Sequence, residues 1–310
     1  MNYLILTPDG VGSTLLQRIL TMCLYLEGEK VTNIHELTNG LELKSGLAVK
    51  NFDLKYTQNL PQITDILKQS SEDTILVSRL AKYHLDIRND EIDDQKYFYD
   101  FLNQHFDKII MCVRENIFEY AMSWSIRQKS GVLNVHNKDD RNKVLQVSEV
   151  DESFFIKKCQ EYVDYQNWIE TNFLNIQQIS YEDMLTNGDS IMETITGYKN
   201  TFTNYFGITL NSIIEKEYSF LQSVAKDQSA DHLSKEEARG LARYRVTSKD
   251  MIFKDIILDL PSKNTTLTDK KNQIKNFNSC LDKFYTFAKN HNWIDQSKAT
   301  YDVWNKEHIC

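Results

Sequence analysis

The stretch YLILTPDGVGSTLLQRIL, from Tyr3 to Leu20, has the pattern of a short apolar strand, a glycine-containing turn and an amphipathic helix. Tyr3–Thr7 is apolar and strand-like, and from Ser13 to Leu26 apolar residues recur at helical spacing. Glycines in the loop between a strand and a helix let successive N–H groups point at a phosphate, and the helix N-terminus adds partial positive charge. The residues predicted to form such a phosphate-binding loop are Gly10, Val11, Gly12, Ser13 and Thr14.

This loop lacks the lysine of the ATP-type motif GxxxxGKS or GxxxxGKT, which reaches the β- and γ-phosphates. Ser13 occupies the position that the lysine would take. The sequence therefore disfavours an ordinary ATP or GTP kinase. The alternative is that the glycines only form a tight turn between strand and helix.

Strand-like and helix-like segments alternate over the first two thirds of the chain. Such alternation predicts βαβ units and an α/β fold with a central, mainly parallel sheet and helices on both faces. The further strands expected are Thr74–Leu80, Lys108–Arg114 and Ile176–Glu182, and the further helices are Glu91–Phe106, Ile117–Gln128 and Phe154–Phe173.

The length of 310 residues is compatible with a single domain spanning residues 1–310. We expect residues 1–200 to form a nucleotide-binding α/β core and residues 201–310 a mostly helical C-terminal flank, with a long helix from Asp269 to Asn290. Two polar segments, Asn134–Lys143 and Ala225–Gly240, are predicted to be solvated loops.

The amino-acid composition argues against some classes of binding partner. The net charge of −8 argues against nucleic acid or an anionic membrane, since both need a basic face. No run of 18 apolar residues and no leader-like N-terminus occurs, so we expect a soluble, cytoplasmic protein. The five cysteines lack CxxC spacing, so no metal site is expected and most are predicted to be buried thiols. They are Cys23, Cys112, Cys159, Cys280 and Cys310.

Three motifs in order resemble those of the sulfotransferases that use 3′-phosphoadenosine 5′-phosphosulfate (PAPS). GVGSTLL matches the second half of that family's phosphosulfate loop. IIMCVRENIFEYAMSW is similar to a strand that ends in an arginine and continues into a helix with a serine, here Arg114 and Ser123. SYEDML, from Ser180 to Leu185, resembles the Tyr-Glu-Asp segment that follows a late strand. The resemblance covers about residues 1 to 190.

The resemblance implies a P-loop-like fold and transfer of a sulfuryl group from PAPS to a hydroxyl or amine, with 3′-phosphoadenosine 5′-phosphate (PAP) as the product. It places the 5′-phosphosulfate on the loop of Gly10–Thr14. Arg114 and Ser123 would grip the 3′-phosphate, and Tyr181 would approach the adenine. Glu182 and Asp183 would have structural roles, holding loops or capping the next helix. The acceptor would be a small molecule, a sugar or a peptide.

The chain departs from the family pattern in three places. Gly10 stands where the family has a lysine or arginine, so another cation would have to reach the loop, and Arg79, Lys82 and Arg127 are the candidates. The interval from Arg114 to Ser123 is one residue longer than usual, which makes Ser125 a fallback contact. The family's C-terminal phosphate contact has no clear counterpart. Its candidates are Arg239, Arg243 and Arg245.

Two residues are candidates for the base that deprotonates the acceptor. His84 lies in KYHL, which resembles the Lys-Thr-His-Leu segment of cytosolic sulfotransferases, and its reference pKa near 6.5 suits proton transfer at neutral pH. Glu36 in NIHELTNG lies where other sulfotransferases place a glutamate base. Two other functions stay open, a P-loop kinase with a degenerate loop and a catalytically inactive sulfotransferase-like binding domain. The aromatic residues expected in the core are Trp124, Tyr162, Tyr165, Trp168 and Phe173.

Overall fold

The computed structural model describes residues 1–8, 10–34, 37–38, 60–70, 73–86, 91–132, 138–207, 209–210 and 270–291. The chain divides into two compact units, each described by itself below. The first unit is Met1–Val113, Tyr165–Glu217 and Gly240–Asp259, and the second is Arg114–Asp164, Tyr218–Arg239 and Leu260–Cys310. The expectation of one domain stays a prediction.

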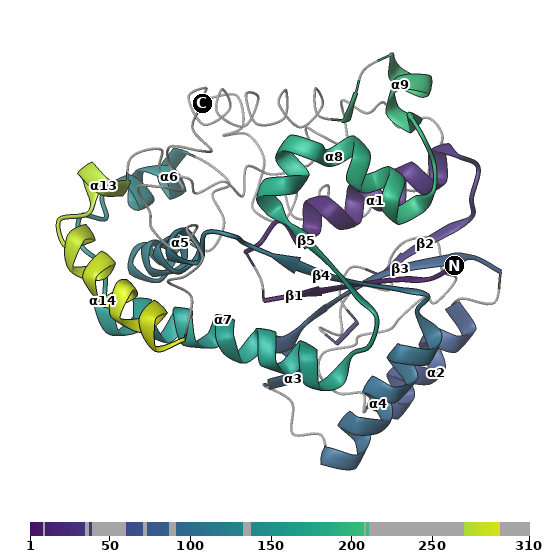
Figure 1. Ribbon diagram of the computed structural model, residues 1–310, viewed down its shortest axis with the longest axis horizontal. Helices are drawn as coiled ribbons and strands as arrows, with labels where there is room; N and C mark the ends of the chain where they lie inside the picture. Colours follow the sequence, from purple (N-terminus) through teal and green to yellow (C-terminus); the bar gives the residue numbers. More distant parts are fainter. Residues whose placement is uncertain are drawn as a thin grey trace. The chain divides into compact units, whose positions relative to one another are not determined.

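The first unit is built on a parallel β-sheet (Figure 1). Among the described residues the sheet has five strands in the order β2-β3-β1-β4-β5, and every pairing is parallel. The strands are β1 Tyr3–Thr7, β2 Val31–Ile34, β3 Ile75–Ala81, β4 Lys108–Val113 and β5 Ile176–Ser180. The predicted α/β fold with a central parallel sheet is confirmed.

Strand β1 is the middle strand and is buried along its whole length. Tyr3 lies beside Val77 of β3 on one side and Lys108 of β4 on the other. A parallel strand that is covered on both faces is expected to be apolar throughout rather than alternating. For this reason the run YLILT predicts β1 clearly from the sequence.

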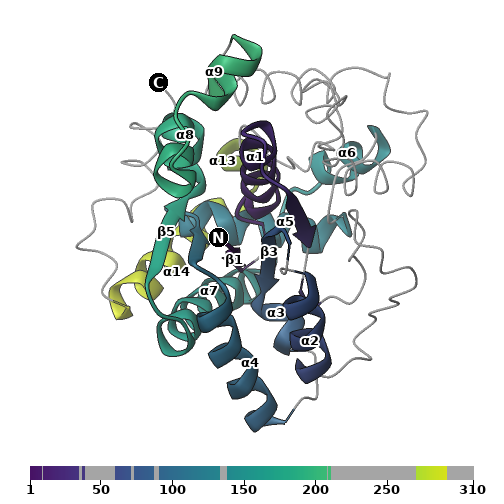
Figure 2. The same ribbon diagram turned by 90° about the vertical axis from the view of Figure 1, so that its right-hand side faces the viewer.

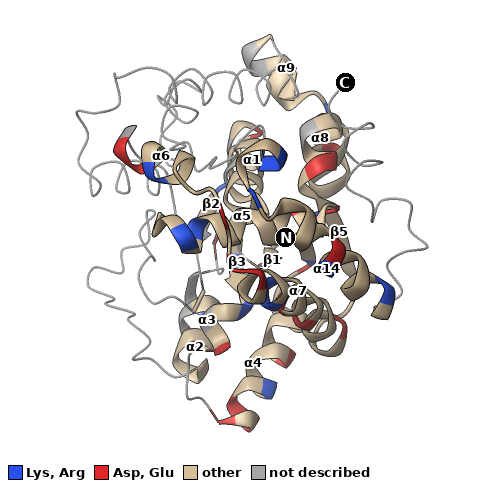
Figure 3. Cartoon of the chain, turned by 90° about the vertical axis from the view of Figure 1, so that its left-hand side faces the viewer, with Lys and Arg blue, Asp and Glu red and all other residues tan. Residues whose placement is uncertain are grey.

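Helices cover both faces of this sheet (Figures 1 and 2). Helices α1 (Ser13–Leu26) and α8 (Tyr181–Thr196) lie on one face, and α2 (Leu60–Ser70) and α4 (Ile92–His105) lie on the other. The first turn of α4 carries acidic residues, whose negative charge interacts favourably with the positive end of the helix dipole (Figure 3). The short helices of this unit are α3 Lys82–Asp86 and α9 Thr201–Phe206.

The strand order creates a topological switch point between β1 and β4. From β1 the chain moves to β2 and β3 on one side of the sheet, and from β4 it moves to β5 on the other side. Open parallel sheets bind ligands outside the carboxyl ends of the strands at such a switch point. The loop of Gly10–Thr14 directly follows the carboxyl end of β1, so it occupies the place where this architecture binds ligands.

The described part of the second unit is helical. Its helices are α5 Ile117–Ser130, α6 Lys138–Leu145, the first part of α7 Glu152–Asn172, α13 Lys270–Gln273 and α14 Phe277–Asn290. The ring of Phe118 contacts Phe155, Phe277 and Phe284 edge to face, with centroid distances of 5.3, 5.1 and 5.6 Å. These four aromatic side chains are buried and form the core that joins α5, α7 and α14.

Several expectations about local structure are wrong. Strand β2 was not predicted. The expected long helix from Asp269 to about Asn290 is interrupted between α13 and α14, where the Asn276 side chain bonds both backbone groups of Val150, at 3.2 and 2.9 Å. Part of the expected loop Asn134–Lys143 is helix α6, while Ala225–Gly240 lies outside the described residues.

Most expectations about burial are confirmed. Tyr162, Tyr165 and Phe173 are buried, whereas Trp124 and Trp168 are only half-buried. Four cysteines are buried free thiols, and Cys310 lies outside the described residues. None of the described helices is long and apolar enough to cross a lipid bilayer.

Candidate functional site

The loop after β1 has the backbone of a turn that only glycine adopts readily. Gly10 has φ 72° and Gly12 has φ 78°, both in the left-handed region. Helix α1 begins at the next residue, Ser13, and the N–H of Leu16 donates to the Gly12 carbonyl at 3.1 Å. The two glycines therefore turn the chain immediately before the positive end of a 14-residue helix.

The loop is held from two directions within the first unit. Val11 is buried, and its carbonyl oxygen accepts a hydrogen bond from Sγ of Cys112 on β4 at 3.3 Å. On the other side, a Cβ atom built on Gly12 would lie 2.3 Å from Cδ2 of Tyr181. Gly12 is thus required twice, by its positive φ and by the close approach of the tyrosine ring.

Tyr181 is the first residue of α8, so the predicted strand Ile176–Glu182 ends two residues early. Ser180 caps the helix, because its hydroxyl oxygen accepts a hydrogen bond from the N–H of Asp183 at 2.9 Å. The cap comes from this serine side chain, whereas Glu182 and Asp183 supply negative charge in the first turn of the helix. The cap sets the start of α8 and thereby the place of the Tyr181 ring beside the loop.

Arg79 of β3 reaches the loop. Its Nη1 donates to Oγ of Ser13 at 3.1 Å and to Oγ1 of Thr14 at 2.7 Å. The residue is 5% exposed. Of the three cations considered for the missing loop charge, Arg79 is the one that the structure brings to the loop hydroxyls.

The other two cations have different neighbours. Lys82 donates to both carboxylate oxygens of Asp86 within α3, at 2.7 and 2.8 Å. Arg127 lies over the Trp124 ring in the second unit, 5.1 Å from its centroid.

The second unit holds a charged cluster centred on Lys270, which contacts Ser123 and Glu119 and is also acted on by the charges of Arg114 and Arg127. Lys270 of α13 donates to Oγ of Ser123 at 2.9 Å and forms an ion pair with Glu119. Ser123 and Glu119 lie one turn apart on α5, so a single ammonium group reaches both. This contact joins two residues that are far apart in the sequence, and nothing in the sequence predicted Lys270.

Lys270 is the most deeply buried charge of the cluster. Its side chain is 2% exposed, against 14% for Glu119. Burial lowers the pKa of Lys270, the Glu119 carboxylate raises it, and the positive charges of Arg114 and Arg127 lower it further, with a net shift below the ordinary value.

Arg114 is held by its backbone at the start of the second unit. Its N–H donates to the Tyr162 hydroxyl at 2.8 Å, and that hydroxyl donates to the Arg114 carbonyl at 3.1 Å. The fallback serine, Ser125, is fully buried and donates to the Ala121 carbonyl at 2.9 Å. Of the two serines, only Ser123 belongs to the charged cluster.

The two candidate bases are not brought together with these groups by any described contact. His84 lies in α3, and its backbone alone is described. Glu36 lies outside the described residues, as do Arg239, Arg243 and Arg245. Within the described ranges, no group of three or more His, Cys, Asp or Glu side chains could hold a metal ion.

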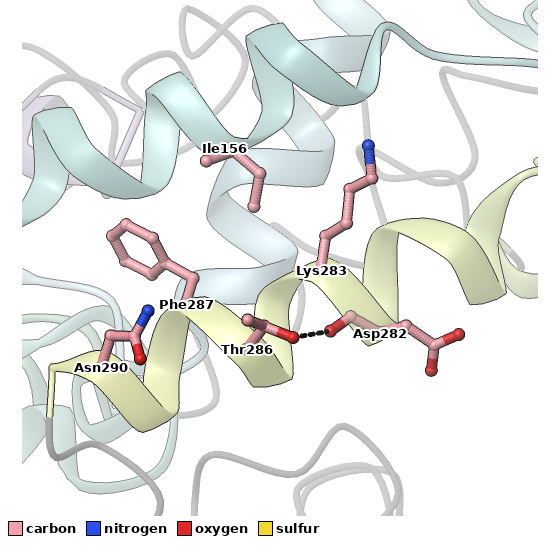
Figure 4. Close-up of a pocket in the computed structure, with 6 residues that line it drawn as sticks. All are labelled: Ile156, Asp282, Lys283, Thr286, Phe287 and Asn290. Atoms are coloured by element: carbon pink, nitrogen blue, oxygen red, sulfur yellow. Dashed lines mark hydrogen bonds between the residues drawn. The ribbon is translucent and has the colours of Figure 1, made fainter.

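A surface pocket in the second unit lies elsewhere. It has a volume of about 400 Å³ and is lined by Ile156 of α7 and by Asp282, Lys283, Thr286, Phe287 and Asn290 of α14 (Figure 4). Thr286 bonds to the carbonyl of Asp282 at 3.1 Å within the helix. None of the residues predicted to bind PAPS or to act as a base lines this pocket, so it is not the candidate site.

Sequence reasoning found the loop but not all of its partners. Arg79 was one of three candidates for the missing loop cation, and Lys270 lies in a polar stretch that resembles any exposed helix end. Comparison of the whole chain with protein-family models and with curated proteins finds no match.

Proposed function

We propose that the chain is a sulfotransferase that moves a sulfuryl group from PAPS to a hydroxyl or amine of a small-molecule, sugar or peptide acceptor. The observation that carries this proposal is the loop of Gly10–Thr14. It combines two left-handed glycines, the N-terminus of α1 and a position at the switch point of a parallel sheet, without the lysine of an ATP-type loop. The choice of PAPS as the ligand of this loop rests on the resemblance of the sequence to PAPS-dependent sulfotransferases.

The residues that the resemblance assigns to PAPS lie in both units, and each set is considered within its own unit. The N–H groups and hydroxyls of Gly10–Thr14 would bind the 5′-phosphosulfate, and Tyr181, whose ring lies against Gly12, would face the adenine. Arg114 and Ser123 would bind the 3′-phosphate, and Lys270 adds a cation that already contacts Ser123.

PAPS would supply the sulfonate. Residues of this chain would accept the proton of the acceptor and stabilise the charge that develops on the leaving phosphate. The acceptor oxygen or nitrogen forms a bond to sulfur as the bond from sulfur to the bridging oxygen breaks, and PAP leaves with the electron pair. The proton of the acceptor passes to a base, His84 or Glu36. Donors on the loop stabilise the charge that develops on the leaving phosphate.

The direct test is titration calorimetry with PAP, ADP and ATP, each with and without magnesium. We expect metal-independent binding of PAP and much weaker binding of ADP and ATP. A preference for ATP with magnesium would instead identify a kinase with a degenerate loop. Binding of PAP without turnover on any acceptor offered would identify an inactive binding domain.

Arg114→Gln tests the assignment of the 3′-phosphate. Loss of a charge-assisted contact costs about 1.5–3 kcal/mol, so the affinity for PAP should fall by roughly ten- to a hundred-fold. Lys157→Gln is the matched control, because Lys157 is 68% exposed in the same unit and its described ion pair, with Glu161, is long at 3.8 Å. Equal affinities of the two folded variants would remove Arg114 from the site.

A further inference from the structure

We propose that Arg79 supplies, from β3, the positive charge that the loop after β1 lacks, and that it acts on the ligand through the hydroxyls of Ser13 and Thr14. This inference rests on the proposed function, because it concerns the group held at the 5′ end. Arg79 is a positioning residue in this scheme.

Arg79 is held at both ends, by its backbone and by its guanidinium. Its backbone pairs with Ile5 of β1, and its carbonyl accepts a hydrogen bond from Leu37 at 2.9 Å. At the other end, Nη1 bonds the hydroxyls of Ser13 and Thr14 at 3.1 and 2.7 Å. A guanidinium keeps its charge at any pH at which proteins fold, so this charge is permanent.

The direction of these bonds determines what the hydroxyls can do. Arginine only donates hydrogen bonds, so Ser13 and Thr14 must accept from it. Each hydroxyl keeps one hydrogen, which must be donated away from the guanidinium. A hydroxyl that accepts from a cation is polarised and becomes a stronger donor in turn. Arg79 thus converts two neutral hydroxyls into oriented donors for an anion.

The two hydroxyls differ in access. Ser13 is 2% exposed, whereas Thr14 is half-buried and makes the shorter bond to Arg79. Thr14 is therefore the principal route by which the charge of Arg79 reaches the ligand. Because Arg79 is buried, solvent screens its charge little. Its position is already set, so it needs no reorganisation when the ligand binds.

The experiment compares two ligands that differ only at the 5′ position, PAP and adenosine 3′-phosphate. Titration calorimetry is done with the wild type, Arg79→Met, Arg79→Lys and Thr14→Val. We expect Arg79→Met to lower the affinity for PAP by up to about ten-fold, the lower end of the range for a lost charge-assisted bond because Arg79 acts through the hydroxyls, with almost no effect on adenosine 3′-phosphate. Arg79→Lys should fall between Arg79→Met and the wild type.

A double-mutant cycle adds a measurement, the coupling between Arg79 and Thr14 in PAP affinity, that would be absent if Arg79 had only a structural role. Once Thr14 is valine, the further change Arg79→Met should cost much less PAP affinity than it costs in the wild type. The ratio of the two ligand affinities is taken on each sample, so partial loss of folded protein cancels. Lys199→Gln, a change at a 73% exposed lysine of the same unit, is the control.

The possible results separate the two proposals. If the wild type binds PAP but Arg79→Met and Arg79→Lys leave the ratio of affinities unchanged, the role of Arg79 is refuted and the proposed function stands. If the effects of Arg79→Met and Thr14→Val simply add, the route through Thr14 is refuted. If the wild type does not bind PAP, the proposed function fails and this inference fails with it.

Discussion

Replacing Lys270 by methionine should destabilise the protein far more than the loss of a surface lysine. The ammonium of Lys270 is 2% exposed and pairs with Glu119, which is 14% exposed. Removing one partner of a buried pair costs about 3–5 kcal/mol, because the other charge stays buried without compensation. Glu119 keeps some access to water, so we expect about 3 kcal/mol for Lys270→Met.

The opposite variant, Glu119→Gln, leaves the more deeply buried charge without its carboxylate. We expect a cost toward 5 kcal/mol, limited by loss of the proton from Lys270, whose pKa is already lowered. The double variant buries no unpaired charge, so its cost should be within about 1 kcal/mol of the wild type. The two single changes should therefore be strongly non-additive.

The assay is urea unfolding followed by circular dichroism at neutral pH. Lys283→Met is the matched control, because Lys283 pairs with Glu152 at 2.7 Å in the same unit but is 51% exposed. An exposed pair of this kind contributes little to stability, because water screens both charges. If Lys270→Met costs no more than Lys283→Met, or if the two changes of the buried pair add, the account of this ion pair is wrong.

Three further outcomes are expected. Gly12→Ala should lose PAP affinity and stability, because its Cβ would lie 2.3 Å from a ring atom of α8, whereas Gly131→Ala, with a similar φ but open space, should lose only the roughly 1 kcal/mol of left-handed strain. Burial holds the pKa of Lys270 below its unfolded value near 10.4, so the unfolded chain binds more protons between the two values; the free energy of unfolding of the wild type, measured in urea from neutral pH upward, should rise with pH relative to Lys270→Met in that window. For the base, loss of PAPS turnover in His84→Ala with retention in Glu36→Ala assigns the role to His84, and the reverse result assigns it to Glu36.

The parts of the fold that the sequence predicted are those where burial leaves a long apolar signal. β1 and α1 have the predicted bounds, and the ends of β3 and β4 differ by one residue. β2 was missed because its four residues, VTNI, include only two aliphatic side chains. The end of β5 was misplaced because Ser180 is both the last strand residue and the cap of α8, a dual role that the apolar pattern does not encode.

The candidate site likewise has a part that the sequence predicted and a part that it did not. Its loop is contiguous in the sequence, so its glycines and hydroxyls could be read directly. Lys270 lies far along the chain from Ser123, and tertiary contacts hold α13 beside the end of α6 and the segment that follows it. Gln273 of α13 donates to the carbonyls of Val144 and Val147 at 3.2 and 2.8 Å. No local pattern distinguishes a lysine that such tertiary contacts will bury from one that stays in water.

Arg79 shows what an anomaly in the sequence can and cannot reveal. A charged residue inside TILVSRL is unusual, because buried strands exclude charge unless it is paired, so the residue signals a buried polar contact. From the sequence, Arg79 was one of three candidates for the missing loop cation, and the choice among them could not be made because the order of strands in a sheet is not encoded locally. Because β3 lies beside β1 in parallel register, Arg79 is level with Ile5, two residues before β1 ends, on the side where α1 begins. A parallel strand next to the switch strand can therefore deliver a cation to the loop without any lysine in the loop itself, which is why the missing lysine does not by itself exclude an anion-binding function.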